Sequence, residues 1–121
     1  MQIDALTPPV APKRWPRGQK FVLSPAGLEA EVSHREAVAA ARSSGRSALD
    51  AALLAWSAPL GVAPIDGVVL VELRSGKKGL NELGRALEAT GLEPAELKAS
   101  VDRLFVAGLV ATVPLASQAD G

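Results

Sequence analysis

The sequence contains no cysteine and no tyrosine, and it has a single histidine, His34, among its 121 residues. The lack of cysteine excludes a disulfide framework, a thiol nucleophile and a thiolate metal site. One imidazole with no nucleophile or carboxylate specified beside it does not make a catalytic site. We therefore predict a protein that is not an enzyme and that has no metal and no cofactor. His34 lies on a charged, alanine-rich segment and is expected to be a solvated surface residue.

Net charge and aromatic side chains are also scarce. Thirteen basic residues balance thirteen acidic ones, and aromatic residues make up 3% of the chain. A neutral chain does not bind nucleic acid or a membrane surface through bulk charge. With so few aromatic residues, the core must consist of leucine and valine packed against some of the 22 alanines.

Long apolar runs are absent as well. The longest uninterrupted runs, such as residues 51–56, fall far short of the roughly 18 residues that a membrane span needs. Residues 1–9 lack the basic start and the apolar stretch of a signal peptide. The sequence therefore predicts a soluble, cytoplasmic protein without a membrane partner.

Proline and basic residues gather at the start of the chain. Residues 1–20 contain four prolines, and their charged residues are Asp4, Lys13, Arg14, Arg17 and Lys20. This composition predicts a flexible, basic, proline-rich arm, followed by a single domain over residues 21–114 and a disordered tail over residues 115–121. Trp15 is equally compatible with stacking on a ligand and with pinning the arm to the domain.

Two helices are predicted in the first half of the domain, after a short strand at residues 21–23. Ser24 and Pro25 are typical of a helix start and Gly45 of a helix end, so we expect the first helix over residues 25–44. The second is expected to run from a Ser47 cap to residue 58. The expected apolar faces are Leu28, Val32, Val38 and Ala39 in the first helix, and Leu49, Leu53, Trp56 and Leu60 in the second.

Three helices and a strand are predicted in the second half. Residues 65–73 are rich in valine, but Ile65, Val69 and Leu73 keep helical spacing. We expect a helix there, because the two helices predicted after residue 79 need a third one to pack against. Residues 74–79 are predicted to form a turn. A helix from residue 80 to Gly91, a helix from Pro94 to Gly108 and a strand over residues 109–113 complete the domain.

A Gly91–Leu92 turn, a helix that opens with Pro94 and the ending Arg103-Leu104-x-x-x-Gly108-Leu109-Val110 form a recognisable pattern. With it, residues 65–114 resemble a bacterial winged helix-turn-helix domain. The resemblance implies a mainly α fold: a three-helix core with a small β-sheet, to which two N-terminal helices are added. The residues after Pro114 are too few and too polar to form the returning strand of a wing. We therefore expect residues 21–23 to pair with residues 109–113.

The resemblance implies a small DNA-binding transcriptional regulator. The candidate DNA contacts are Lys98, Ser100 and Arg103 on the helix after Pro94, Lys77 and Lys78 in the turn, and Lys13, Arg14, Arg17 and Lys20 in the arm. Glu96 and Ala99 on the same helix are unfavourable for contacts with bases. The alternative is a non-catalytic winged-helix adaptor that binds a protein or peptide. The two N-terminal helices are also candidates for a homodimer interface.

Overall fold

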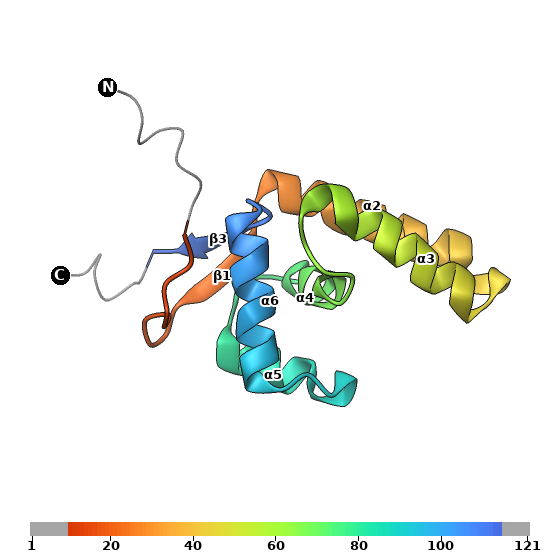
Figure 1. The fold of residues 1–121 in the computed structure, drawn as a ribbon. Coiled ribbons are helices and arrows are strands. Elements are labelled where there is room, and N and C mark those ends of the chain that lie inside the picture. The colour runs from red at the N-terminus through yellow and green to blue at the C-terminus, as the bar shows by residue number, and fades with distance from the viewer. Residues whose placement is uncertain (1–9, 115–121) are drawn as a thin grey trace, which may run out of the picture.

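The structure is a computed structural model and describes residues 10–114. Within them, five α-helices and three short strands follow one another as shown in Figure 1. The helices are Pro25–Ala41 (α2), Arg46–Ser57 (α3), Asp66–Leu73 (α4), Leu80–Ala86 (α5) and Pro94–Val106 (α6). The strands are Lys20–Leu23 (β1), Lys78–Gly79 (β2) and Val110–Val113 (β3). The predicted mainly helical fold with a small sheet is confirmed. The first nine residues of the predicted arm and the predicted tail over residues 115–121 lie outside the described residues.

The sheet joins strands from opposite ends of the described chain. Its order is β2-β1-β3, and both pairs are antiparallel. β1 pairs with β3 from Lys20↔Val113 to Leu23↔Val110, as predicted for these segments. The expectation of a simple turn over residues 74–79 was incomplete, because Lys78–Gly79 pairs with the other edge of β1. A strand of two residues has too few positions to show the alternation that identifies a strand.

The core lies where the sheet meets α4, α5 and α6. It consists mainly of leucine and valine, with Phe21, Trp56 and Ala30. The core side chains without exposed surface are Phe21, Val69, Leu70, Leu83, Val101 and Leu104. They come from β1, α4, α5 and α6, and α6 contacts α4, α5 and β3.

α2 and α3 form an antiparallel pair that extends to one side of the core (Figure 1). Ser24 caps α2 as predicted, because its hydroxyl oxygen accepts a hydrogen bond from the amide of Gly27 at 3.0 Å. The prediction of a Ser47 cap was wrong: α3 begins at Arg46, and the residue before it is Gly45. Gly45 has a φ of 97°, a conformation that glycine adopts readily and that lets the helix begin earlier.

The buried face of α2 differs from the predicted one. Leu28 and Val32 are 52% and 41% exposed, while Ala30 and Ala41 are buried. Small side chains on the inner face let the neighbouring helices approach closely. At the start of α2, a Cβ atom on Gly27 would overlap the backbone carbonyl of Leu109, so glycine is needed where α2 meets the entry to β3.

The prediction that His34 is a solvated surface residue was wrong. Its side chain is buried, and its ring packs edge-to-face on Trp56 with the two centroids 4.8 Å apart. The ring occupies space beside Gly67 of α4 that a Cβ atom would fill. Trp56 is in turn held by its indole N–H, which donates to the carbonyl oxygen of Ala30 at 3.0 Å. The contacts of His34 come from two other helices, so the residues around it in the sequence gave no sign of them.

The burial of His34 makes the stability of the fold depend on pH. Burial lowers the pKa of His34 below its usual value, although the neighbouring Glu31 carboxylate opposes the shift. The unfolded chain then binds a proton at higher pH than the folded protein does. We expect the free energy of unfolding to fall by up to about 1.4 kcal/mol per pH unit as the pH drops below roughly 6.5. Urea unfolding at a series of pH values measures this loss. The His34→Phe variant should lose less unfolding free energy than the wild type as the pH drops. An equal loss in that variant would contradict the assignment.

Candidate binding grooves around helices α5 and α6

Local caps and one glycine set the geometry of α5 and α6. Glu82 accepts a hydrogen bond from the amide of Gly79 at 2.8 Å and so caps the start of α5. Glu96 does the same for the amide of Glu93 at 2.9 Å at the start of α6. Between the helices, Gly91 has a φ of 81°, which turns the chain toward Pro94. These short-range signals set where the two helices begin and where the chain turns between them.

A buried carboxylate joins α6 to α4. Asp66 is fully buried, and its two carboxylate oxygens accept hydrogen bonds from Ser100 Oγ at 2.6 Å and from Arg103 Nη2 and Nε at 2.8 and 2.9 Å. A fourth bond comes from the backbone amide of Ala63 at 2.9 Å. The hydrogen bonds to Asp66 raise the pKa of the Arg103 guanidinium above its usual value. The network links α4 to α6 through side chains inside the described core.

This network changes the roles of two predicted DNA contacts. Ser100 does not face outward as expected: it is fully buried and has no surface to offer to a ligand. Arg103 keeps 40% of its side chain exposed, but its guanidinium makes a bidentate pair with Asp66. The local sequence of α6 gives no sign of this partner, which lies 34 and 37 positions away along the chain from Ser100 and Arg103.

The described part of the arm covers another part of α6. Trp15 donates its indole N–H to Asp102 Oδ1 at 2.9 Å, and its ring packs edge-on against Phe21 and Phe105 with centroid distances of 5.0 and 5.2 Å. Lys98, a third predicted DNA contact, donates to the Asp102 carboxylate and to the carbonyl oxygen of Pro12. Of the two alternatives for Trp15, the structure shows the one in which it pins the arm.

The other predicted DNA contacts are basic residues with two kinds of surroundings. Lys20 pairs with Glu82 at 2.6 Å, and Lys78 donates to Ser75 Oγ at 2.8 Å and lies 3.8 Å from Glu72. The Lys20 hydrogen bond is the main reason why the pKa of Glu82 lies below its usual value. Four predicted contacts are exposed and form no ion pair within residues 10–114: Lys13, Arg14, Arg17 and Lys77.

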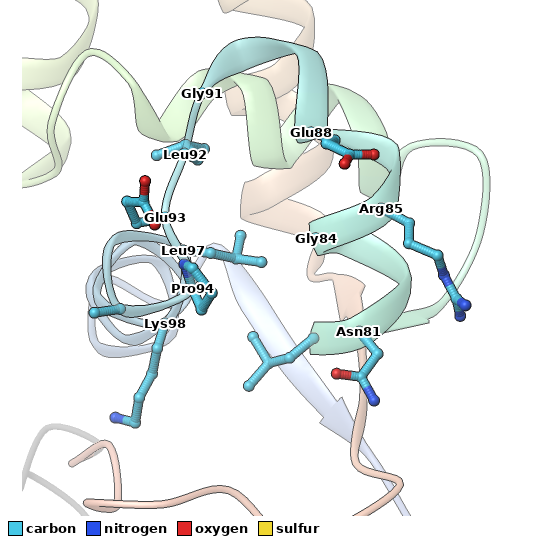
Figure 2. Close-up of a pocket in the computed structure, with 12 residues that line it drawn as sticks. Asn81, Gly84, Arg85, Glu88, Gly91, Leu92, Glu93, Pro94, Leu97 and Lys98 are labelled. Atoms are coloured by element: carbon cyan, nitrogen blue, oxygen red, sulfur yellow. The ribbon is translucent and has the colours of Figure 1, made fainter.

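A groove of about 780 Å³, here called the apolar groove, lies between α5 and the first half of α6 (Figure 2). Its apolar lining consists of Leu80, Gly84, Leu92, Pro94, Ala95 and Leu97, and its polar lining of Asn81, Arg85, Glu88, Glu93 and Lys98. Figure 2 shows Leu97 pointing from α6 toward α5, with Arg85 and Lys98 extending at opposite sides. This groove was not predicted from the sequence. The one feature of the sequence that pointed to the groove is Gly84, a glycine that lies inside a helix and is not needed for a turn.

A second groove of about 670 Å³, here called the basic groove, adjoins the first. The arm and α5 line it, and Leu80, Asn81 and Arg85 belong to both grooves. Its charged side chains are Arg14, Arg17, Lys20 and Arg85 against the single carboxylate of Glu82. The structure thus brings three of the predicted arm residues together with Arg85, which was not among the predicted contacts.

Comparisons with protein-family models, curated proteins and solved structures gave no match for this chain. Among residues 10–114, no helix combines the length and apolar character needed to cross a membrane. Within the same residues, no three or more side chains of the metal-ligating types His, Asp and Glu are grouped so that they could hold an ion.

Proposed function

We propose that the protein is a non-catalytic, winged-helix-like adaptor domain that binds a segment of another protein in the apolar groove. The likeness to a winged helix is supported by the succession α4, β2, α5, α6 and β3 and by the place of β1. β1 lies beside β3, where the returning strand of a wing would lie. The likeness supports a binding role, and the surfaces of α5 and α6 favour one type of partner.

The apolar groove is the observation that carries this proposal. An apolar floor inside a polar rim is typical of surfaces that take one or two apolar side chains and orient them by hydrogen bonds at the edge. Leu92 and Leu97 provide such a floor, and Asn81 and Arg85 lie on the rim. An exposed protein segment has both kinds of group to offer.

The surface of α6 does not favour the reading of DNA bases. A base-reading helix presents long hydrogen-bonding side chains to the major groove. On α6, Lys98 and Arg103 are engaged with carboxylates, and Ser100 is buried. The exposed first turn carries Glu96, whose negative charge would face the phosphates.

Gly84 provides the test. A Cβ atom there would meet only Leu97 Cδ2, at an ordinary contact distance of 3.8 Å, so Gly84→Ala should fit and stabilise α5 by about 0.5–1 kcal/mol. Gly84→Phe should instead fill the apolar groove. We expect peptides selected from a random display library to bind the wild type and Gly84→Ala similarly, and Gly84→Phe about tenfold more weakly or less. Anisotropy titrations of the labelled peptides measure these affinities.

Ala86→Phe is the matched control, because Ala86 is exposed on α5 and lines neither groove. It should leave peptide binding unchanged. The proposal would be contradicted if no selected peptide had a higher affinity for the wild type than for the Gly84→Phe variant. Thermal unfolding followed by circular dichroism identifies any variant that has lost the fold.

A DNA-binding regulator is the second candidate, and the exposed basic residues Lys13, Arg14, Arg17 and Lys77 support it. Such residues contact phosphates and give binding that is strongest at low salt. A duplex of mixed sequence, titrated at low ionic strength, separates the two candidates. The adaptor proposal expects the duplex to bind more weakly than the selected peptides do, and equally to the wild type and to Gly84→Phe.

The homodimer stays a prediction. Leu28, Val32 and Leu54 on the α2–α3 pair are 52%, 41% and 61% exposed, and they are the large apolar side chains available for such a contact within the described part of these helices.

A further inference from the structure

We propose that the segment bound in the apolar groove is acidic, and that its carboxylates lie in the basic groove. This inference rests on the proposed function and adds the chemistry of the partner. It depends on the continuity of the two grooves, the distribution of charge around them and the way in which the arm is held.

The two grooves form one surface. Leu80, Asn81 and Arg85 line both of them, so a chain leaving the apolar groove on that side enters the basic groove directly. An extended chain advances about 3.3 Å per residue, and a few residues therefore suffice to reach from one groove to the other. An apolar anchor and nearby carboxylates can thus belong to one short segment.

The basic groove has positive charge that the described protein does not neutralise. Arg14, Arg17 and Arg85 form no ion pair within residues 10–114. The one carboxylate in the groove, Glu82, already accepts hydrogen bonds from Lys20 Nζ at 2.6 Å and from the amide of Gly79 at 2.8 Å. Guanidinium groups bind carboxylates in bidentate geometry, so the three arginines match an acidic segment.

The arm is held on both sides of the turn that carries Arg17, and Arg14 directly precedes the first of the two attachments. On one side, Trp15 is bonded to Asp102 and packed on Phe105. On the other, Gln19 donates its side-chain amide to the carbonyl oxygen of Val113 at 2.8 Å, and its backbone amide bonds to the carbonyl oxygen of Pro16 at 3.1 Å. A backbone held in this way loses less freedom on binding than a mobile arm would.

An acidic protein segment fits this surface better than nucleic acid does. Phosphates would occupy the basic groove but leave the apolar groove unfilled. Glu88 and Glu93 on the other part of the apolar groove would also repel a polyanion that crossed both grooves. The partner therefore carries its carboxylates on one side of its apolar anchor.

The test compares two triple variants that remove the same charge. Arg14→Gln, Arg17→Gln and Arg85→Gln together empty the basic groove of arginine. Lys13→Gln, Arg42→Gln and Lys77→Gln remove three exposed bases that line neither groove. For the peptides selected on the wild type, we expect an excess of Asp and Glu next to the apolar residue. The first triple variant should weaken their binding about tenfold or more and flatten its salt dependence, and the second should change it by less than about twofold.

Other outcomes separate this inference from the proposed function. One outcome would overturn this inference and leave the proposed function standing. In it, the selected peptides bind Gly84→Phe more weakly than the wild type, but they show no excess of Asp and Glu and bind both triple variants equally. Equal weakening by both triples would also overturn it, since general charge would then explain the effect. Failure to select any peptide sensitive to Gly84→Phe would overturn both proposals. Duplex DNA bound through the three arginines, without such peptides, would replace them with the regulator.

Discussion

Asp66→Ala is expected to lower the free energy of unfolding by about 2–4 kcal/mol, less than the loss of one partner from a fully buried ion pair, because Arg103 keeps 40% of its side chain exposed and can be solvated. The carboxylate is fully buried and accepts four hydrogen bonds, from Ser100, from two nitrogens of Arg103 and from the amide of Ala63. Its loss leaves the buried Ser100 hydroxyl without its partner and removes the polar link between α4 and α6. Denaturant unfolding followed by circular dichroism measures the change.

Asp102→Ala is the matched control for this prediction. Asp102 also accepts hydrogen bonds from a tryptophan and a lysine, but its side chain is 25% exposed, so water can replace the lost partner. We expect a cost of about 1 kcal/mol. A cost for Asp66→Ala no larger than that of Asp102→Ala would show that the network does not hold α6.

Leu104→Ala should cost about 2–5 kcal/mol, because it removes a fully buried side chain from the centre of the core. Leu104 lies on α6 among side chains from α4, α5 and β1, and this crowded site cannot collapse around the space left behind. Equilibrium unfolding of Val106→Ala, a variant in the same helix, provides the comparison. Val106 is 45% exposed, so its loss should cost less than about 0.5 kcal/mol. Equal effects of the two substitutions would place Leu104 outside the core.

Several features of the fold could be derived from the sequence because the forces behind them act over a few residues. Ser24 and Pro25 mark the start of α2, and Pro94 marks the start of α6. A helix cap bonds to amides two or three positions away, and a proline restricts its own backbone, so neither needs distant partners. The pairing of β1 with β3 was also predicted, because the residues after Pro114 are too few and too polar to supply a partner strand for β3.

The candidate site depended on contacts between residues far apart in the sequence. The polar side chains of Ser100 and Arg103 look suited to bind a ligand when α6 is considered alone, but Asp66 accepts their hydrogen bonds in the folded protein. Likewise, Arg85 joins Arg14 and Arg17 only because the arm folds back beside α5. Charge and polarity are properties of a residue, whereas the availability of that charge depends on which partner the fold brings to it.

The two helices at the start of the domain show the same difference between what local sequence determines and what packing determines. Their existence and approximate ends could be derived from glycine, proline and helix-forming residues along the chain. The buried face of α2 could not be derived in this way. Glycine, alanine, glutamate and histidine line the inside of the helix, while Leu28 and Val32 remain exposed. Close helix packing favours small side chains over large apolar ones, and the place for His34 exists only because Gly67 of α4 lies opposite it. Local pattern therefore specified the elements, and the packing between them specified the inner faces and the grooves.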